Sequence, residues 1–392
     1  MKYLVILGDG MADRPIESLG GRTPLEYAKT PKMDELAAKG EIGMVHTIPD
    51  GMKPGSDTAN LSVLGYNPRE FYSGRSPLEA LSIGVPMKDT DVALRCNIVT
   101  LSEEEDNYED RTIIDHSSGE ISTEECAVLL EAVKKELETD IFHFYVGTSY
   151  RHCLIWENGE VVDLVQPHDV LGQKIGDKLP ENEALRTMMK KSYDILVNHP
   201  INIERKKKGL NPANSCWFWG AGTKPALYPF TERTHKKGAM ISAVDLLKGI
   251  AVGTSMKVIT VDGANGGLDT NYEGKAKAAL DVLTRDGYDF VYVHLEGPDE
   301  MGHQGSVEKK VKAIERLDER IIRPIAEGLA AAGEDFRMVV LPIIRHRFPC
   351  AHTRRTMCRI CSMTARQSAV RAGITMSARL HRQRTLYRRD IN

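Results

Sequence analysis

The sequence predicts an α/β protein, with a mostly parallel sheet that carries helices on both faces, plus an inserted smaller α+β domain. Short apolar segments alternate with segments of helical length in the first and last parts of the chain, whereas turns separate short strands in its middle. Of the 392 residues, 41% are apolar and 27% are charged. This composition suffices for a large buried core and excludes a disordered or collagen-like protein.

The parallel sheet is predicted from apolar segments. The first covers residues 2–7 and ends at Gly8-Asp9-Gly10, a pattern typical of a buried strand that presents polar groups at its carboxyl end. Similar segments lie at 257–261, 290–295 and 338–341, and helical patterns accompany them at 33–39, 239–251, 274–285 and 307–328. This alternation is typical of parallel strands joined by helical crossovers.

The middle of the chain predicts the α+β insert at 88–205. Its strand patterns lie around a helical pattern at 123–137, and they cover 92–101, 139–146, 153–156 and 161–165. The α/β domain is then discontinuous, formed by 1–87 and 206–342, and a tail follows at 343–392. We interpret the basic run at 205–209 as a solvated connection and not as a nucleic-acid patch.

The tail differs in composition from the rest of the chain. It contains twelve Arg, no Lys and a single acidic residue, so a basic tail follows an acidic body. The chain has no run of eighteen apolar residues, its opening apolar stretch leads directly to polar residues, and its seven Cys lack the spacing of a disulfide framework. We therefore expect a cytoplasmic protein whose partners include neither a membrane nor a nucleic acid.

Polar side chains follow two of the predicted strands. Asp9 comes directly after the first strand, and Asp299 and His303 follow the strand that ends at residue 295. Ligands of open parallel sheets bind beyond the carboxyl ends of the strands. A spacing of four puts Asp299 and His303 on one face of a helical turn, within reach of one metal ion. A surface pair is the alternative interpretation of this spacing.

Ser56 is the candidate nucleophile. It follows Pro54-Gly55 and precedes an apolar-periodic segment, which indicates a helix start, where unpaired backbone N–H groups attract a phosphate. A hydroxyl becomes a nucleophile near neutral pH only if a base or a metal ion draws off its proton. Asp9 and a metal site at Asp299 and His303 would meet this condition. The alternative is that Ser56 only caps the helix.

Six segments together carry a family resemblance. They read GDGMAD from Gly8, PGSDTAN from Pro54, SGRSPLEA from Ser73, YRH from Tyr150, WFWG from Trp217 and GPDEMGH from Gly297. In this order they resemble the cofactor-independent phosphoglycerate mutases of the archaeal type, which belong to the alkaline phosphatase superfamily. The likeness extends from residue 1 to about residue 342.

The resemblance implies an alkaline phosphatase-like fold and a glycolytic isomerase that interconverts 2-phosphoglycerate and 3-phosphoglycerate, its small-molecule substrates. In the family, a Ser at the position of Ser56 takes the phosphoryl group and returns it to the other hydroxyl, without 2,3-bisphosphoglycerate. Two divalent metal ions assist, Mn²⁺ or Mg²⁺, with Zn²⁺ or Co²⁺ as alternatives. Asp9 and Ser56 match ligands of one metal ion, and Asp299 and His303 match ligands of the other.

The insert is expected to anchor the substrate, because Arg side chains bind phosphate and carboxylate groups with two parallel hydrogen bonds. Arg151 and His152 are the first candidates, followed by Arg95 and Asn97. The alternative for each is an ordinary polar group at the surface or at a strand end.

The end of the chain departs from the family pattern. Relatives place Asp-His directly after the strand that corresponds to 338–341 and Thr-His-Thr shortly beyond, and this chain has neither there. Codons can be chosen for 342–354 that, read in another frame, encode DHPPSISLRTHT. We therefore hypothesise a shift of reading frame near Pro342. We expect impaired mutase activity, because each metal ion would keep only two of its protein ligands.

Other interpretations of the chain stay open. A metal-dependent phosphomonoesterase of the same superfamily, or an inactive relative that binds a phosphorylated ligand, would use the same residues. In the tail, a zinc site at Cys350, His352, Cys358 and Cys361 and nucleic-acid binding by the Arg residues are less favoured, because a misframed tail yields such spacings by chance. We expect the tail to be disordered.

Overall fold

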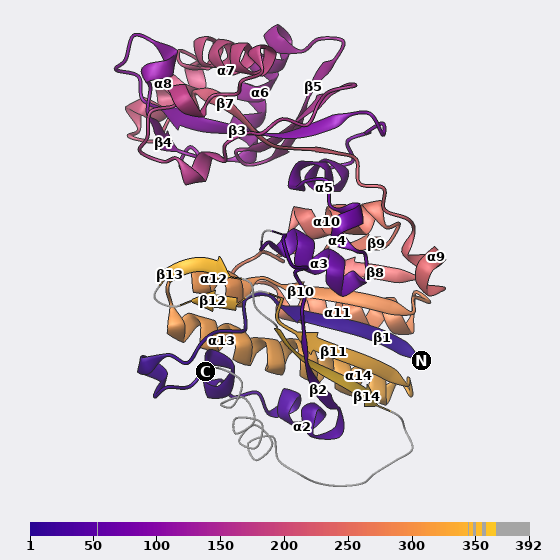
Figure 1. Cartoon of the computed structure of the whole chain (residues 1–392). Coiled ribbons are helices and arrows are strands. Elements are labelled where there is room, and N and C mark those ends of the chain that lie inside the picture. Colours follow the sequence, from indigo (N-terminus) through magenta and orange to yellow (C-terminus); the bar gives the residue numbers. More distant parts are fainter. Residues whose placement is uncertain (53, 344, 348–349, 355–357, 366–392) are drawn as a thin grey trace. The chain divides into compact units, whose positions relative to one another are not determined.

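A computed structural model describes the chain except residues 53, 344, 348–349, 355–357 and 366–392, and it describes side chains up to residue 343. The chain forms two compact units (Figure 1), one from Met1–Tyr72 with Leu227–Asn392 and the other from Ser73–Ala226. The second unit extends beyond the expected 88–205 at both ends. The reason is that α5 (Arg75–Ser82) packs on β3 (Val92–Leu101) and on β7 (Ser215–Thr223), which pairs with β3.

The first unit contains a seven-stranded sheet in the order β2-β14-β11-β1-β10-β8-β9 (Figure 1). Its parallel strands are β1 (Lys2–Gly8), β8 (Gly238–Ile241), β9 (Lys257–Ile259), β10 (Phe290–Leu295) and β11 (Phe336–Leu341). β14 (Cys358–Ala365) pairs antiparallel with both β11 and β2 (Glu41–Val45). The predicted mostly parallel sheet is therefore confirmed.

Helices pack on both faces of this sheet. Leu4 and Ile6 of β1 belong to a core shared with α11 and α14, whereas Tyr292 of β10 hydrogen-bonds to Asn60 of α3 on the opposite face. The helices of this unit are η1 (Glu17–Leu19), α1 (Pro24–Tyr27), α2 (Pro31–Lys39), α3 (Ser56–Leu64), α4 (Pro68–Phe71), α9 (Phe230–Thr234), α10 (Asp245–Gly253), α11 (Tyr272–Thr284), α12 (Gly297–His303), α13 (Val307–Leu317), the π-helical η5 (Asp318–Ile322) and α14 (Arg323–Ala331). Asp318 fixes the start of α2, because its carboxylate accepts from the backbone N–H groups of Lys32 and Met33.

The second unit contains an antiparallel five-stranded sheet in the order β4-β3-β6-β5, in which β7 also pairs with β3. Its remaining elements are η2 (Tyr108–Asp110), β4 (Ile113–Asp115), α6 (Thr123–Leu137), β5 (Phe142–Thr148), β6 (Arg151–Trp156), η3 (Pro167–Asp169), η4 (Gly176–Lys178), α7 (Glu183–Leu196) and α8 (Pro200–Lys207). Residues 161–165, expected as a strand, have no regular structure, although Val165 accepts a hydrogen bond from the Trp217 indole.

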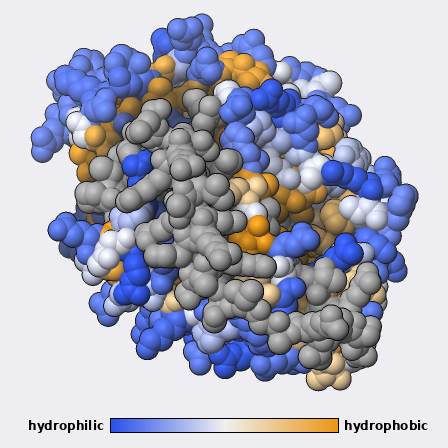
Figure 2. All heavy atoms as spheres, turned by 60° about the horizontal axis from the view of Figure 1, so that its bottom comes forward, coloured by the Kyte–Doolittle hydropathy of each residue, from blue (hydrophilic) through white to orange (hydrophobic). Residues whose placement is uncertain are grey.

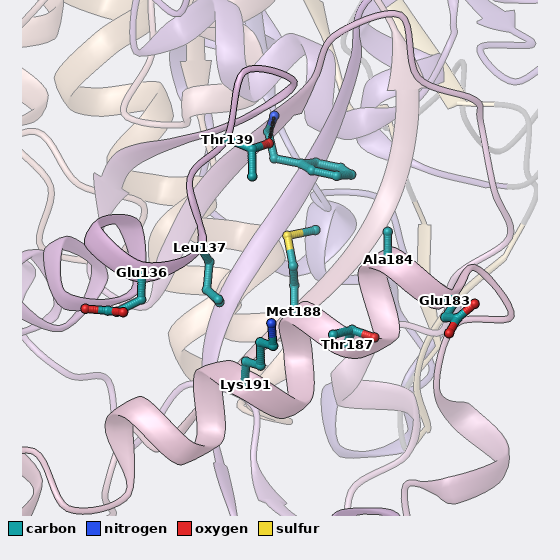
Figure 3. Close-up of a pocket in the computed structure, with 9 residues that line it drawn as sticks. Glu136, Leu137, Thr139, Glu183, Ala184, Thr187, Met188 and Lys191 are labelled. Carbon is teal, nitrogen blue, oxygen red and sulfur yellow. Dashed lines mark hydrogen bonds between the residues drawn. The ribbon is translucent and has the colours of Figure 1, made fainter.

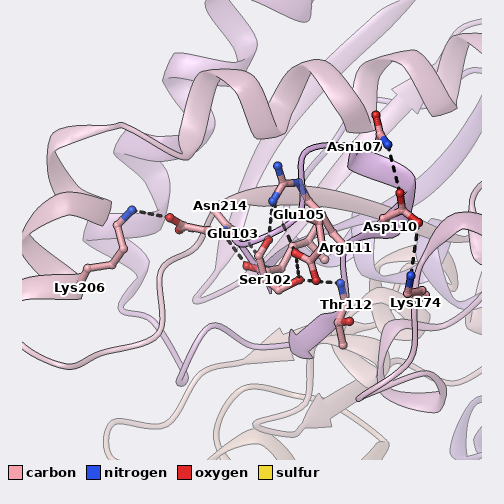
Figure 4. A network of polar contacts seen from close by, with 11 residues as sticks. Ser102, Glu103, Glu105, Asn107, Asp110, Arg111, Thr112, Lys174, Lys206 and Asn214 are labelled. Carbon is pink, nitrogen blue, oxygen red and sulfur yellow. Dashed lines mark hydrogen bonds and ion pairs between the residues drawn. The ribbon is translucent and has the colours of Figure 1, made fainter.

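A polar network closes the turn between β3 and β4 (Figure 4). The Arg111 guanidinium donates to the Ser102 carbonyl at 2.9 Å and stacks over the Tyr193 ring, 4.1 Å from its centroid. The Ser102 hydroxyl accepts from the Thr112 backbone N–H and donates to Glu105. These contacts hold together a loop that carries several charged side chains.

The tail contains strands where we expected disorder. β12 (Arg345–Arg347) pairs with β13 (Cys350–Arg354), and β14 enters the large sheet, because the edges of β11 and β2 offer unpaired backbone groups. The prediction of disorder is wrong for these strands, and the rest of the tail, apart from Ile343, lies outside the described residues. The four residues considered as a zinc site lie where the structure describes no side chains.

One face of the molecule is drawn in Figure 2, where hydrophilic side chains predominate and hydrophobic patches are interspersed. Among the described residues, no helix has both the length and the apolar character needed to cross a membrane.

Candidate active site

Asp9 lies where the sequence predicted it, at the carboxyl end of β1. Its backbone N–H donates to the Leu295 carbonyl at 2.9 Å, which ties it to the end of β10. The neighbouring Gly10 has φ +67°, and a Cβ there would lie 2.5 Å from the Asp299 Cα. Only glycine therefore lets the start of α12 approach Asp9 so closely.

Ser56 is the first residue of α3, as its position after Pro54-Gly55 predicted. Gly55 is the N-cap, in extended conformation, and makes no side-chain cap hydrogen bond, while Asp57 Oδ1 accepts from the Thr58 backbone N–H at 2.7 Å. The Ser56 hydroxyl instead donates to Asp9 Oδ2 at 3.3 Å. This contact favours the nucleophile over the capping alternative, because Asp9 occupies the place from which a proton acceptor or a bound cation would act.

Asp299 and His303 lie one turn apart on α12, which follows β10 directly. His303 Nε2 is 3.3 Å from Asp299 Oδ2. The hydrogen bond to Asp299 raises the pKa of His303, and burial opposes it. The structure thus forms the pairs Asp9–Ser56 and Asp299–His303, and the close approach at Gly10 brings the two pairs to the same edge of the sheet.

In the second unit, Arg95 and Asn97 lie on one face of β3. The Arg95 guanidinium stacks over the Trp219 ring, 4.6 Å from its centroid, and its Nε lies 3.0 Å from Glu79 Oε2. Burial lowers the pKa of Arg95 to about 10, so the group stays cationic at neutral pH. Asn97 is held at both ends of its amide, by the His116 carbonyl and by the Trp219 indole N–H.

Arg151 and His152 do not share a face of their strand. Asn97 pairs with Arg151 in the register of β3 and β6, so Arg151 lies on the face of Arg95 and Asn97, with its guanidinium 5.4 Å from the Tyr150 ring centroid. The adjacent His152 turns to the other face, because successive strand residues point to opposite sides. We therefore separate these two candidates, which the sequence analysis had grouped.

His152 is buried beneath α6. Its Nδ1 accepts from the Gly147 backbone N–H at 3.1 Å, and its Nε2 lies 3.0 Å from Cys126 Sγ. Burial lowers its pKa to about 4, so the ring is neutral at physiological pH. Both ring nitrogens are engaged within the unit, an arrangement that favours a structural role over substrate contact.

Sequence reasoning missed two imidazoles beside Arg95 and Arg151. The His116 ring lies 5.7 Å from Tyr150 and 6.0 Å from the His168 ring, and His168 lies 5.6 Å from Trp219. Arg95, Arg151 and these rings form a cationic and aromatic surface on one face of the sheet. His116 directly follows the short strand β4, a position that could have identified it.

Comparison with known proteins decides the family. The family model of the 2,3-bisphosphoglycerate-independent phosphoglycerate mutases matches residues 37–202. A mutase of that name from Methanosarcina barkeri is 51% identical over 348 residues, covering 87% of this chain and 85% of the relative. This chain belongs to that family. A probable mutase from Geobacter sulfurreducens is 48% identical, with the same coverage of both chains.

Solved structures agree with the family assignment. A protein from Pyrococcus horikoshii has a TM-score of 0.75 and 31% identity, covering 93% of this chain and 87% of its own. The cofactor-independent phosphoglycerate mutase of Thermoplasma acidophilum has a TM-score of 0.60 and 26% identity, covering 96% and 92%. The α/β architecture and the family resemblance of the sequence are thus confirmed, and by family the chain is an isomerase.

Further buried groups surround Asp9 in this mutase-family fold. His294 Nε2 lies 3.5 Å from Asp9 Oδ2, and its Nδ1 lies 3.3 Å from the Ser242 hydroxyl. Burial lowers the pKa of His294 to about 4. Burial also raises the pKa of Glu296 to about 7 and lowers that of Lys275, which donates to the His294 carbonyl, to about 8. Near neutral pH, His294 is therefore uncharged, and Glu296 and Lys275 are each partly in their uncharged form.

The donor chemistry at this edge suits a hard divalent cation. It comprises two carboxylates, a hydroxyl and an imidazole. Among the residues with described side chains, however, no three His, Cys, Asp or Glu are placed to hold one metal ion together. Asp9–Ser56 and Asp299–His303 each bring two donors together, and their role as metal ligands stays a prediction.

A cavity of about 460 Å³ lies elsewhere in the second unit, between the end of α6 and the first turns of α7 (Figure 3). Leu137, Phe142 and Met188 supply its apolar surface, and Glu136, Glu183 and Lys191 carry the charges around it. It contains none of the predicted site residues, so we do not assign it to the active site.

Proposed function

We propose that this chain acts on phosphoglycerates and moves the phosphoryl group between the 2- and 3-hydroxyls of glycerate through Ser56. The observation that carries the proposal is the Ser56 hydroxyl at the start of α3, 3.3 Å from Asp9 Oδ2. A hydroxyl at a helix N-terminus meets an incoming phosphate where the helix dipole favours negative charge. The family of the chain supports this substrate.

The proposed transfer has two balanced steps. A bond forms between Ser56 Oγ and phosphorus while the bond from phosphorus to the glycerate 3-oxygen breaks, and the serine proton ends on the glycerate hydroxyl. The reverse reaction at the 2-hydroxyl regenerates Ser56. Asp9 orients the hydroxyl of Ser56 within the first unit. On the second unit, the guanidinium groups of Arg95 and Arg151 are our candidates for binding an anionic phosphoglycerate.

We also propose that two divalent cations, Mn²⁺ or Mg²⁺, occupy this site, with Zn²⁺ or Co²⁺ as alternatives. Asp9 and Ser56 would hold one, and Asp299 and His303 would hold the other. When bound, such cations neutralise phosphate oxygens and lower the pKa of a coordinated hydroxyl. The substrates are small metabolites, and we propose the cytoplasm as their place of conversion.

We propose further that the activity of this chain is impaired by a shifted reading frame after Pro342. The missing Asp-His and Thr-His-Thr segments support this, and so does the coverage of the relatives, because the unmatched share of the chain is the size of its tail. DNA sequencing across the codon of Pro342 tests it. A one-nucleotide change that restores the frame should restore activity, and codons that cannot encode the expected segments would contradict the proposal.

The function itself is tested by incubating the frame-restored protein with 3-phosphoglycerate and Mn²⁺. Intact-mass analysis with peptide mapping should find a phosphoryl group on Ser56, and ³¹P NMR should find 2-phosphoglycerate. Ser56→Ala should lose both signals. Ser62→Ala is the matched control, because the Ser62 hydroxyl of the same helix donates only to the Thr58 carbonyl at 3.1 Å.

Two alternatives have distinct outcomes in this experiment. A phosphomonoesterase would release inorganic phosphate in place of 2-phosphoglycerate. An inactive phospho-ligand-binding relative would bind 3-phosphoglycerate but carry no phosphoryl group on Ser56, and the missing metal ligands favour this outcome for the chain as written.

A further inference from the structure

Two neighbouring polar residues on β10 face the helix that carries Ser56. Tyr292 and His294 are two apart on the strand, so both point to the same face of the sheet. Both are at most 1% exposed. Buried polar side chains at the middle of a sheet are costly unless they are hydrogen-bonded, so their partners define their role.

Tyr292 reaches the nucleophile through one intermediate residue. Its hydroxyl donates to Asn60 Oδ1 at 2.5 Å, and Asn60 Nδ2 donates to the Ser56 carbonyl at 2.7 Å. Asn60 has no exposed surface. Two buried hydrogen bonds therefore connect β10 to the backbone of Ser56.

The direction of each hydrogen bond follows from the chemistry of the groups. The Ser56 carbonyl only accepts, so the amide nitrogen of Asn60 must face it, and the amide oxygen is then left to accept from Tyr292. Burial raises the pKa of Tyr292 well above its usual value, so its hydroxyl stays a donor. The amide of Asn60 consequently has one orientation.

The same strand also reaches the hydroxyl of Ser56 from a second side. His294 Nε2 lies 3.5 Å from Asp9 Oδ2, the atom to which the Ser56 hydroxyl donates. Two residues of β10 thus lie near Ser56 by different routes. Tyr292 is linked to the Ser56 carbonyl through Asn60, and His294 lies near Asp9, which accepts from the Ser56 hydroxyl. A displacement of about 1 Å between reacting groups can cost on the order of 100-fold in rate.

We propose that Tyr292 and Asn60 are positioning residues, which hold the start of α3 so that the Ser56 hydroxyl keeps its contact with Asp9. The inference rests on the proposed function of Ser56. It goes beyond that function because neither residue touches the substrate or a metal ion in the transfer described above. Removal of the Tyr292 hydroxyl should loosen the first turn of α3 while the rest of the unit stays folded.

The test uses Tyr292→Phe and Asn60→Asp in the full chain. Asn60→Asp keeps an acceptor for Tyr292 but loses the donor to the Ser56 carbonyl. Tyr66→Phe is the matched control, because Tyr66 is equally buried and its hydroxyl donates to the Tyr228 carbonyl at 3.0 Å. Hydrogen–deuterium exchange of the peptide that covers the start of α3 is measured first, because it needs no activity.

We expect amide exchange in the first turn of α3 to be about 5- to 10-fold faster in both test variants than in Tyr66→Phe, the effect of one lost buried hydrogen bond. Equal exchange in Tyr292→Phe and Tyr66→Phe would overturn the proposal. If the frame-restored protein forms no phosphoserine, the proposed function fails, but this comparison still decides the positioning of α3.

Where the parent chain does form phosphoserine at Ser56, a second readout separates positioning from general damage. Tyr292→Phe should slow phosphoserine formation about 10- to 100-fold, with the half-saturating concentration of 3-phosphoglycerate unchanged. The proposal would be contradicted if the rate of phosphoserine formation did not change, or if only the half-saturating concentration of 3-phosphoglycerate changed. A loss of the same size in Tyr66→Phe would contradict it as well.

Discussion

The Lys310 ammonium lies 2.7 Å from the Asp13 carboxylate, and neither side chain is exposed to solvent. Burial lowers the pKa of Lys310, and Asp13 opposes this effect. The pair lies in the unit that carries Ser56, and Asp9 and Asp299 add to the negative field around Lys310. Removing one partner of a buried ion pair strongly destabilises a protein, whereas replacing both partners by apolar residues changes its stability little.

Lys310→Met should therefore destabilise the protein by about 3–5 kcal/mol, because it leaves the Asp13 carboxylate buried without its partner. The double variant Lys310→Met with Asp13→Leu should recover most of this loss. Urea unfolding measures both. The control is Lys277→Met, which breaks an exposed ion pair with Asp281 and should cost no more than about 0.5 kcal/mol. A small effect of Lys310→Met alone would show that the pair is dispensable.

Acid should destabilise the second unit through His152. Burial lowers its pKa to about 4 in the folded state from 6.5, so the unfolded chain binds more protons between these values and stability falls as the pH drops. Between pH 7.5 and pH 5.0 the parent should lose about 2 kcal/mol more unfolding free energy than His152→Asn. Chemical denaturation at both pH values measures this, and parallel losses would contradict it.

Arg151 and His152 should differ in their effect on ligand binding, although they are adjacent in sequence. Arg151→Leu should weaken the binding of 3-phosphoglycerate at least about 10-fold, because one charge-assisted contact is lost. His152→Asn should change it less than about 2-fold. Fluorescence of Trp219, which stacks on Arg95, provides the titration signal. Equal losses in both variants would return His152 to the binding surface.

Binding of Mn²⁺ should be weak in the chain as written and tight after the frame is restored. If the restored frame supplies the Asp-His and Thr-His-Thr segments that we propose, each cation would gain ligands, and we expect affinity to rise at least about 100-fold. Titration followed by electron paramagnetic resonance measures the free Mn²⁺. In the restored protein, Asp299→Asn should lower the number of tight sites, whereas Glu273→Gln, in an exposed pair with Arg320, should not.

The fold was predictable where periodicity is local. Apolar runs predicted β1, β9, β10 and β11, and Gly8-Asp9-Gly10 marks the carboxyl end of β1. The prediction of a helix at 239–251 was wrong for its first residues, because Gly238–Ile241 form the buried strand β8 and the helix begins only at Asp245. The start of the second unit at Ser73 was not predictable, because it depends on α5 packing against β7, a strand far along the chain. The pairing of β14 could not be foreseen either, because nothing in the tail's composition indicates a strand.

The candidate site was predictable in part. Asp9 and Ser56 lie in contact, as do Asp299 and His303, at positions that motif spacing indicated, because strand ends and helix starts have local signals. Their chemical roles stay predictions. The opposite orientations of Arg151 and His152 also follow from strand alternation, once residues 151–156 are assigned to a strand. Asn60 and Tyr292 gave no signal, since a hydrogen bond between distant segments exists only in the folded chain.

The glycine at position 10 has a consequence for synthesis. It leaves room for a segment that the ribosome adds only after most of the polypeptide has been made, because the Asp299 backbone fills the space beside it. A nascent chain that stops before α12 contains Asp9 and Ser56 but neither Asp299 nor His303. The close approach of Gly10 and Asp299 should therefore form only once translation has passed that late helix.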